Sequence, residues 1–372
     1  MLDWLACAAA GREQPAVRAA IEAAPEERLH HAAAAGHVLD FDDTWTPGLA
    51  HLSAATAPAA LFAVAGRDGT VVEAAAAYAN GFETMAVLAR HGHPEIYARG
   101  LHPTAATGVV GAAAAWHAGS GTDPGARAAA LALALTRSGG LLASFGGDGK
   151  ALGVAGAVVA GRDAARLAAA GASAGLEAIL AGVCRSWGVE PLPAAALLDP
   201  TGGAIEGNWI KAYPCCLQTH SAIEAALTVD ARSAPAGQLK IRVHPISLEA
   251  AAIEEPKTGM EAKFSIPYLV TWALLRGKPD VATFDGVDEE VVEASRRLEV
   301  EADGTLQQSE AVLERDGYEL ARIGEALGSP SRPMSASELE AKARALGGDG
   351  LIGVLDDPDA PAATALEAAG LL

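Results

Sequence analysis

The chain has 372 residues and carries 27 basic and 46 acidic side chains, for a net charge of −19. With a pI near 4.9 and no cluster of lysine and arginine, the composition argues against binding to nucleic acid or to an anionic membrane surface. Hydrophobic residues make up 51% of the chain but aromatic residues only 5%, and runs such as VEAAAAYA show how much of that share is alanine. Because alanine favours helix formation and lets helices approach closely, we predict a largely α-helical body.

The sequence also predicts where the protein resides. It has no apolar run long enough to cross a membrane, and the first residues, MLDWLACAAAGRE, place an acid and no base ahead of a short apolar stretch, unlike a signal peptide. We therefore expect a soluble, cytoplasmic protein. Its four cysteines form no CxxC pair, so we expect all four to be small buried side chains in a reduced compartment: Cys7, Cys184, Cys215 and Cys216.

In chain order, residues 1–211 are predicted to form helices separated by glycine and proline turns, with Pro47, Pro58 and Pro103 at helix starts or breaks. The composition then changes. From about residue 226, LTVDARSAPAGQLKIRVHPISL alternates apolar and polar residues with period two, which predicts a half-buried pair of strands.

After these strands, EAKFSIPYLVTWALLRG predicts an amphipathic helix, and DEEVVEASRRLEVEADG predicts a helix that runs into a strand. A last helix, SASELEAKARALGG, opens with a capping box in which Ser335 is followed three residues later by Glu338. The expected fold is mainly α. It combines a large all-helical domain of residues 1–211 and 331–372 with a smaller inserted α+β lid domain of residues 212–330.

Several short patterns do not support the function that they suggest. GASAG at 171–175 lacks the strand that a nucleophile elbow needs, so Ser173 is predicted to be a small packing residue. GGDGK at 146–150 lacks the Ser or Thr that follows the lysine of a phosphate-binding loop. The His30–His31 and His91–His93 pairs have no Cys or carboxylate at ligand spacing, and we predict no metal site.

Four other segments place polar residues inside apolar sequence. They are HVLDFDDTWTPGLAH, ARGLHPTAATG, SFGGDGKAL and NWIKAYPCCLQTH. Because Pro103 disfavours helix in the residue before it, His102 is expected to be extended or in a turn. Lysine is rarely found in apolar, glycine-rich surroundings without a partner, so Lys150 and Lys211 are candidate functional residues.

Taken together, these segments resemble the MmgE/PrpD family, which includes 2-methylcitrate dehydratase, cis-aconitate decarboxylase and iminodisuccinate epimerase. The resemblance extends over nearly the whole chain and follows the family order: LDWLACAAAGR, DFDDTWTPGLAH, RGLHPTAATG, GGDGKAL, IKAYPCCLQTH, EAKFSIPY and GSPSRPMSASELEAKA. It implies a helical domain, a smaller α+β lid, a homodimer, a small carboxylate substrate, and no metal or organic cofactor.

The resemblance also implies the site residues, which fall on Asp40, Thr44, His51, His102, Lys150, Lys211 and Tyr268. We expect His102 and His51 to act as acid and base, with Asp40 fixing a histidine tautomer. Lys150 and Lys211 would bind substrate carboxylates and stabilise charge that develops next to them. The hydroxyls of Thr44 and Tyr268 would donate to a substrate oxygen.

Two departures from the family pattern keep alternatives open. Gly153 stands where relatives usually have the histidine of K-x-L-H, and the segment ahead of DFDDT is short. The first hypothesis is a cofactor-independent lyase, a hydro-lyase or a decarboxylase, that acts on a small di- or tricarboxylate. Loss of the histidine slightly favours a second, an isomerase that epimerises a substituted succinate. The short start motivates a third, a non-catalytic or partner-dependent paralogue.

Overall fold

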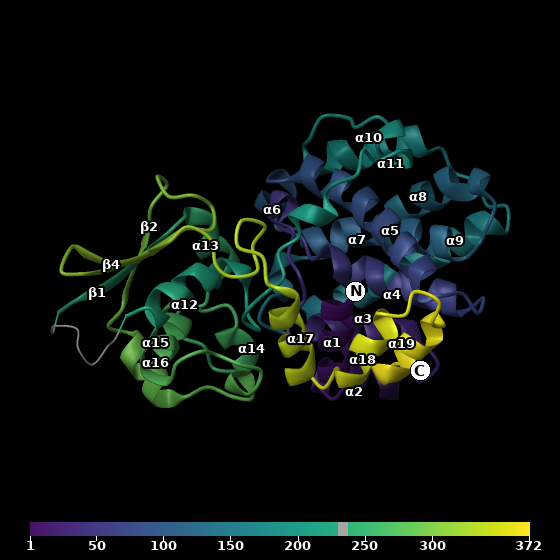
Figure 1. Cartoon of the computed structure of the whole chain (residues 1–372). Helices are drawn as coiled ribbons and strands as arrows, with labels where there is room; N and C mark the ends of the chain where they lie inside the picture. The colour runs from purple at the N-terminus through teal and green to yellow at the C-terminus, as the bar shows by residue number, and fades with distance from the viewer. Residues whose placement is uncertain (230–236) are drawn as a thin grey trace.

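The computed structural model describes residues 1–229 and 237–372 and has a mainly α fold, with a large helical body beside a smaller α+β part (Figure 1). The helices of the body up to residue 211 are α1 (Leu2–Gly11), α2 (Pro15–Ala23), α3 (Arg28–Val38), α4 (Leu52–Ala65), α5 (Val71–Gly92), α6 (Glu95–Ala98), α7 (Pro103–Gly119), α8 (Arg127–Leu135), α9 (Gly149–Ala169), α10 (Leu176–Trp187) and α11 (Ala195–Leu198). Short 3-10 turns connect some of them: η1 (Thr46–Gly48), η2 (Pro124–Ala126), η3 (Leu142–Ser144) and η4 (Ile205–Gly207).

Helix α7 lies at the centre of the body and packs against α4, α5 and α9. These helices approach closely because their contact faces consist largely of alanine and glycine. At Gly161 of α9, a Cβ would lie only 2.5 Å from the carbonyl oxygen of Val109 in α7, so the crossing requires a residue without a side chain. The composition thus predicted the close helix packing correctly.

The C-terminal helices return to the body after the α+β part. They are α17 (Ala336–Ala345), α18 (Asp349–Leu355) and α19 (Ala362–Ala368). Helix α17 packs on α1 and α19 on α4, so the yellow C-terminal segment lies beside the purple N-terminal one in Figure 1. One buried apolar cluster joins these helices to the N-terminal half, and a second is built mostly from residues 212–313. This division of the core supports the predicted domain boundaries near 211 and 331, which stay a prediction.

The α+β part contains one mixed four-stranded sheet in the order β2-β1-β3-β4. Strand β1 pairs in parallel with β2 and antiparallel with β3, and β3 pairs antiparallel with β4. The elements of this part are η5 (Leu217–Thr219), α12 (His220–Leu227), β1 (Leu239–Val243), α13 (Pro245–Ala250), α14 (Gly259–Ala262), α15 (Ile266–Arg276), η6 (Ala282–Phe284), α16 (Glu289–Ser295), β2 (Glu299–Ala302), β3 (Ala311–Arg315) and β4 (Tyr318–Ile323).

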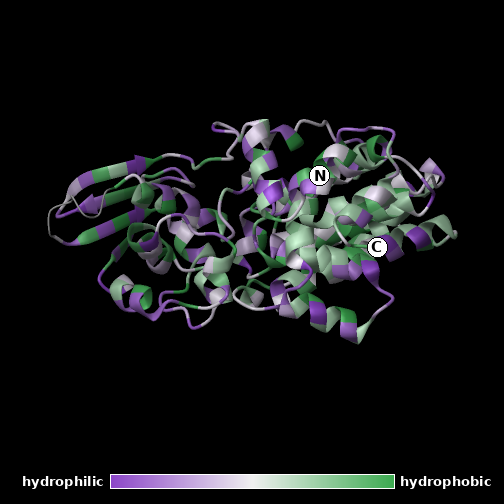
Figure 2. Ribbon diagram, turned by 60° about the horizontal axis from the view of Figure 1, so that its bottom comes forward, coloured by the Kyte–Doolittle hydropathy of each residue, from purple (hydrophilic) through white to green (hydrophobic). Residues whose placement is uncertain are grey.

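Hydropathy distinguishes the two parts. Figure 2 shows hydrophobic residues concentrated in the helical body and alternating with hydrophilic ones along the strands of the sheet. Helix α12 packs on β3 and β4 and α15 on β2, so the apolar side chains of the strands are covered by helices. No helix among the described residues is long and apolar enough to span a bilayer.

Several predicted elements are confirmed. The amphipathic segment forms α15, the next segment forms α16 followed by β2, and both hydrogen bonds of the Ser335–Glu338 capping box are present at the start of α17. All four cysteines are buried and free.

Other predictions were wrong in detail. The predicted strand pair is a single strand, β1, because residues 226 and 227 end α12; residues 230–236 lie outside the described residues. Strand β1 pairs instead with β2 and β3. Alternation of apolar and polar residues within one segment predicts a strand but does not identify its partners. Pro58 lies inside α4 rather than at its start. Ser173 is exposed in the loop between α9 and α10 and does not pack in the core.

Candidate active site

A small cavity of about 40 Å³ lies between the helical body and the α+β part. The body contributes Asp40, Thr44, Leu49, His51, Tyr97, His102, Phe145 and Lys150 to its lining. Residues after position 211 contribute Cys216, Leu217, Gln218, Ala250 and Phe264. Five of the seven predicted site residues therefore face one cavity, although they are spread over more than a hundred positions of the chain.

The ends of helices place these side chains. Asp40 follows α3 with a left-handed φ of 53°, which turns the chain sharply out of the helix. His51 is the N-cap residue of α4 and His102 that of α7, both with extended backbone. The extended conformation of His102 was predicted from Pro103, which begins α7. Lys150 lies in the first turn of α9.

The centre of the site is one oxygen of the Asp40 carboxylate. Asp40 Oδ1 accepts hydrogen bonds from Lys150 Nζ at 2.7 Å and from Lys211 Nζ at 2.8 Å. Lys211 Nζ also donates to the carbonyls of Asp40, at 2.9 Å, and Cys215, at 3.0 Å. Lys211 does not line the cavity, but Asp40 connects it to the residues that do.

This arrangement leaves an excess of positive charge. Burial opposes ionisation of Asp40, but Lys150 and Lys211 outweigh it and hold the pKa of the carboxyl well below its usual value. Burial likewise opposes the charge on Lys211, and Asp40 reverses that effect and raises the pKa of the ammonium. Two ammonium groups thus face one carboxylate in a protein whose overall charge is −19. The next carboxylate, Asp42, lies behind the cavity, so on the cavity side a second anion beside Asp40 would be attracted to the two lysines.

The two histidines of the cavity are neutral at physiological pH. Burial, reinforced by Lys211 and Lys150, outweighs the attraction of Asp42 and lowers the pKa of His51 to about 3. Burial and Lys150 lower the pKa of His102 well below its ordinary value. A neutral imidazole accepts a proton at one nitrogen and donates from the other, so either histidine can serve in proton transfer.

Aromatic rings close the cavity around the lysine. Lys150 Nζ lies 5.3 Å from the ring centroid of Phe145 and 5.5 Å from that of Phe264, within the range of a cation–π contact. Phe145 also meets the ring of His102 edge-on, at 5.0 Å between centroids. The Thr44 hydroxyl is buried and has no hydrogen-bond partner among the described residues, so it is available to a ligand. The walls therefore combine aromatic rings with a polar group that has no partner in the protein.

Tyr268 does not line the cavity either and, unlike Lys211, has no hydrogen bond to Asp40. It lies on α15 and is fully buried, and its hydroxyl accepts a hydrogen bond from the backbone N–H of Asp288 at 3.1 Å. The ring packs 6.0 Å from that of Trp272 on the same helix. In this structure Tyr268 therefore stabilises the α+β part, through its hydrogen bond with Asp288 and its ring contact with Trp272.

We therefore expect Tyr268→Phe to leave kcat/KM unchanged within about twofold. The variant loses one internal hydrogen bond, which lowers the free energy of unfolding by about 0.5–1.5 kcal/mol. Steady-state kinetics together with denaturant unfolding measure both quantities. A fall of about a hundredfold in kcat with unchanged stability would instead return Tyr268 to the site, through a conformation different from this one.

Two buried lysines that sequence reasoning missed hold the main chain of the site. Lys263 Nζ donates to the carbonyls of Leu39 at 2.7 Å and Pro214 at 2.9 Å. Lys342 Nζ, on α17, donates to Phe41 at 2.7 Å and Lys211 at 2.9 Å. Lys263 does have a sequence signal, since it stands within the apolar run AKFSIP, but nothing near Lys342 in sequence indicates its role.

Asp43, next to the site, makes the stability of the fold sensitive to pH. Its carboxylate accepts a long hydrogen bond, 3.3 Å, from the backbone N–H of Ser53, and burial together with the charges of Asp42 and Asp3 raises its pKa to about 7, against the opposing effect of Ser53 and Asn208. The folded protein thus binds a proton that the unfolded chain releases above its ordinary pKa of 3.8. Stability is highest below that value and is lost progressively as the pH rises to about 7.

Asp43→Asn is expected to remove the loss of folding stability that occurs as the pH rises, because the amide cannot ionise. At pH 8 the variant should be more stable than wild type by an amount on the order of 4 kcal/mol, whereas at pH 4 the difference should vanish or reverse. Thermal unfolding across this pH range measures the effect. Parallel curves for the two proteins would show that Asp43 is ionised in the fold.

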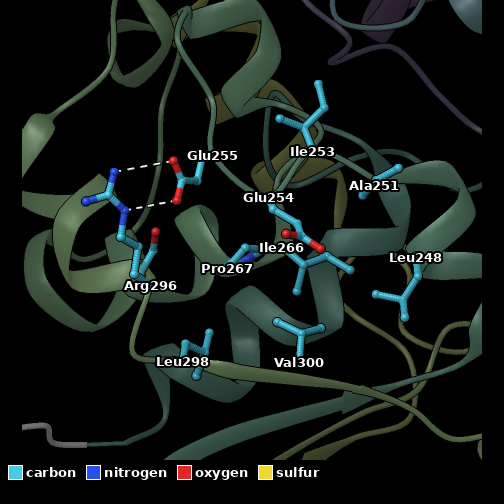
Figure 3. Close-up of a pocket in the computed structure, with 12 residues that line it drawn as sticks. Leu248, Ala251, Ile253, Glu254, Glu255, Ile266, Pro267, Arg296, Leu298 and Val300 are labelled. Atoms are coloured by element: carbon cyan, nitrogen blue, oxygen red, sulfur yellow. Dashed lines mark hydrogen bonds and ion pairs between the residues drawn. The ribbon is translucent and has the colours of Figure 1, made fainter.

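A larger cavity lies elsewhere, within the α+β part, and has a volume of about 520 Å³ (Figure 3). It contains none of the predicted site residues. Its arginine, Arg296, pairs with Glu255 at 3.0 Å, as the dashed lines in Figure 3 show, and with Glu293. This cation is already neutralised, so the cavity is poorly suited to an anionic substrate.

One group of side chains has the composition of a metal site. Ligand atoms of His37, Asp42 and His51 all lie within 4.8 Å of one another. However, Lys150 and Lys211 lie beside this group and lower the pKa of His51, and the same positive charges would repel a divalent cation. The residues present therefore fit a hydrogen-bonded cluster better than a metal centre.

Comparison with protein families places this site in a known context. The model of the MmgE/PrpD N-terminal domain matches residues 29–189, and that of the MmgE/PrpD C-terminal domain matches residues 213–356. The first match contains Asp40, His51, His102 and Lys150, and Lys211 lies between the two matches. No curated protein matches the chain significantly. With both domain models matched in order over most of its length, the chain belongs to the MmgE/PrpD family, which supports an enzyme of the lyase or dehydratase type.

Proposed function

We propose that the protein is a cofactor-independent lyase, a hydro-lyase or a decarboxylase, that acts on a small di- or tricarboxylate in the cavity around Asp40. The observation that carries the proposal is the binding of two buried ammonium groups, those of Lys150 and Lys211, to one oxygen of Asp40 beside two histidines. Such a site attracts carboxylates and can stabilise the charge that forms next to them.

Substrate binding follows from the unbalanced charge. A substrate carboxylate beside Asp40 accepts a hydrogen bond from Lys150 Nζ, and the Thr44 hydroxyl is free to donate to a second oxygen. Lys211 acts on the substrate through its charge, because its three N–H donors already bind Asp40 and Cys215. Since the site is buried, these interactions are stronger than they would be in water. The overall negative charge of the protein provides no general attraction for anions, so affinity depends on these few groups.

In a decarboxylation, the C–C bond to the leaving carboxylate breaks, carbon dioxide departs, and the electron pair left on carbon takes a proton from an acid. In a dehydration, the step is removal of a proton from the carbon next to the carboxylate. A histidine takes this proton, the C–H electron pair forms the double bond, and the C–O bond breaks. The leaving hydroxide takes a proton from a second acid and departs as water. We assign His51 as the base and His102 as the acid, because both line the cavity and both are neutral. The two lysines stabilise the enediolate-like charge of the transition state.

The size of the cavity indicates that the two parts of the protein must separate for binding. A volume of about 40 Å³ holds about three water molecules and is too small for a citrate-sized substrate. Phe264, Cys216 and Gln218 close it from the side of the α+β part. Movement of that part away from the body would admit the substrate, and its return would exclude water.

A second candidate function is epimerisation of a substituted succinate. It is favoured by the presence of two histidines at one cavity, because one ring can accept the α-proton on one face while the N–H of the other returns a proton on the opposite face. Gly153 is exposed, and a Cβ there would meet no atom within 4 Å, so no other side chain fills the place of the absent histidine. A site with fewer hydrogen-bond donors suits a substituted succinate, which has fewer carboxylates to bind than a tricarboxylate.

One experiment separates these functions. Purified protein is incubated in D₂O with citrate, 2-methylcitrate, cis-aconitate and substituted succinates, and proton NMR follows each substrate. A lyase produces an alkene or a decarboxylated product, whereas an epimerase incorporates deuterium without loss of water or carbon dioxide. Lys211→Met serves as the inactive control. Turnover by this variant equal to wild type would contradict the proposed site.

Metal removal provides a further test. We expect dialysis against EDTA to leave turnover unchanged, because the charge of Lys150 and Lys211 takes the place of a metal ion in binding and stabilising the carboxylate. The rate of the active reaction is measured before and after dialysis, with elemental analysis of the protein. Loss of activity that Mg²⁺, Zn²⁺ or Fe²⁺ restores would show that His37, Asp42 and His51 hold a metal.

A further inference from the structure

Behind the cavity, the carboxylate of Asp42 lies beside two histidines, His37 and His51. Asp42 Oδ2 accepts a hydrogen bond from His37 Nδ1 at 2.9 Å and lies 3.2 Å from His51 Nδ1. All three residues are buried. His37 comes from α3, Asp42 from the turn that follows α3, and His51 from the N-cap of α4, so the end of one helix and the start of the next are joined through this carboxylate.

The protonation states of this cluster follow from its charges. The histidines hold the pKa of Asp42 far below its usual value despite burial, so the carboxylate is ionised. Burial lowers the pKa of His37, so its ring is neutral. A neutral ring at 2.9 Å from an ionised carboxylate must donate, which places the His37 proton on Nδ1 and leaves Nε2 unprotonated. His37 Nε2 is buried and without a hydrogen-bond partner among the described residues.

The same reasoning extends to His51, whose ring is also neutral. Its Nδ1 lies 3.2 Å from Asp42 Oδ2, near enough for a strong electrostatic attraction although the contact lacks hydrogen-bond geometry in this structure. Its Nε2 lies 3.5 Å from Asp40 Oδ1, too far for a good hydrogen bond. Moreover, Asp40 Oδ1 already accepts from two lysines. The proton of His51 therefore belongs on Nδ1, and the lone pair of Nε2 is left for a substrate proton.

We propose that Asp42 and His37 are positioning residues, which hold His51 as its Nδ1–H tautomer and weaken it as a base by sharing one carboxylate oxygen between two rings. The inference rests on the proposed function only for the role of His51 as base. Neither Asp42 nor His37 lines the cavity.

The sharing of Asp42 determines how strongly His51 binds a proton. The charged and titratable groups around His51 are Asp40, Asp42, His37, His102, Lys150 and Lys211. Among them, Asp42 favours the imidazolium form of His51, whereas the two lysines oppose it. Each N–H donor on Asp42 Oδ2 reduces the negative charge that the oxygen offers to the other. Without His37, Asp42 interacts with His51 alone.

NMR of protein labelled with ¹⁵N in its ten histidines tests the inference without reference to activity. We expect the wild-type His51 ring, assigned through His51→Gln, to show a protonated Nδ1 and an unprotonated Nε2. In Asp42→Asn the preference for this tautomer should be lost. In His37→Phe the pKa of His51 should rise by about one half to one unit, and His37→Asn, which restores an N–H donor, should bring it back toward wild type.

His30→Asn is the matched control, since His30 is a partly exposed histidine on the same helix as His37. In steady-state kinetics, Asp42→Asn should lower kcat by about 10²–10⁴-fold with little change in KM, as expected for a wrong tautomer in an intact site. Circular dichroism confirms that each variant folds.

The two proposals can fail separately. An active wild-type enzyme whose His51 carries its proton on Nε2, or whose pKa is unchanged in His37→Phe, would overturn this inference and leave the lyase assignment standing. A wild-type protein with the expected tautomer and the expected response to His37→Phe, but silent toward the whole carboxylate panel, would instead contradict the proposed function.

Discussion

Replacing Lys211 with methionine is expected to lower kcat/KM by about 10³-fold, since it removes a preorganised cation from the point where charge develops in the transition state. The methionine side chain is similar in length to that of lysine and can occupy the space that the methylene groups of Lys211 fill. The remaining ammonium, that of Lys150, still pairs with Asp40, so the carboxylate stays ionised and the local excess of positive charge is lost. The effect should appear in both kcat and KM, because the charge of Lys211 also attracts the ground-state carboxylate.

Steady-state kinetics on the active substrate from the NMR panel measure this effect. Lys257→Met, a change at an exposed lysine of the α+β part, is the matched control and should retain full activity. Thermal unfolding of both variants separates loss of chemistry from loss of fold, because Lys211 also donates to the carbonyls of Asp40 and Cys215. A folded Lys211→Met protein with more than a tenth of wild-type kcat/KM would contradict its role.

His102→Asn has the second large effect, an expected loss of about 10²–10⁴-fold in kcat, the usual contribution of a general acid or base. KM should change little, since His102 makes no hydrogen bond to Asp40 or the lysines among the described residues. Asparagine keeps a polar side chain at the N-cap of α7, so the helix should persist. His30→Asn provides the control for simple loss of a histidine.

The pH profile of wild type tests the same assignment. Because the pKa of His51 is lowered to about 3 and that of His102 well below its ordinary value, neither histidine changes its charge between pH 5 and 8. The rate should therefore be nearly flat over this range. A steep limb near pH 6.5 would mean that one of the two rings is far more exposed to water in the working enzyme than in this structure.

The sequence was sufficient for the parts of the fold that depend on local pattern. Alanine-rich segments predicted the body, and apolar periodicity and a capping box predicted α15, α16 and α17. The alternation of apolar and polar residues after residue 226 wrongly predicted a strand pair, because the pattern within one segment carries no information about its partner. Strand β1 pairs with segments some 60 to 75 positions away, at 299–302 and 311–315.

The candidate site likewise contains residues that the sequence could predict and residues that it could not. The types and motif positions of Asp40, His51, His102 and Lys150 were enough to select them, and the fold brings them to one cavity. Tyr268 was selected on the same grounds and lies outside it. His37 was missed, because a histidine three residues ahead of Asp40 has no meaning until α3 ends and Asp42 turns back to meet it. Side chains that act through another residue leave little signal in a single sequence.

The lysine on α17 has a consequence for how the support of the site is completed. Lys342 fixes the carbonyls of Phe41 and Lys211, and its bond to Phe41 spans 301 positions of the chain. Contacts so distant in sequence close late in folding, because each must overcome the entropy of a long loop. During synthesis, the first 330 residues can build helices and a sheet without this clamp. The main chain at Phe41 and Lys211 therefore gains these two hydrogen bonds only when the last tenth of the chain has docked, so the end of the chain completes the support of a site that lies mostly in its first half.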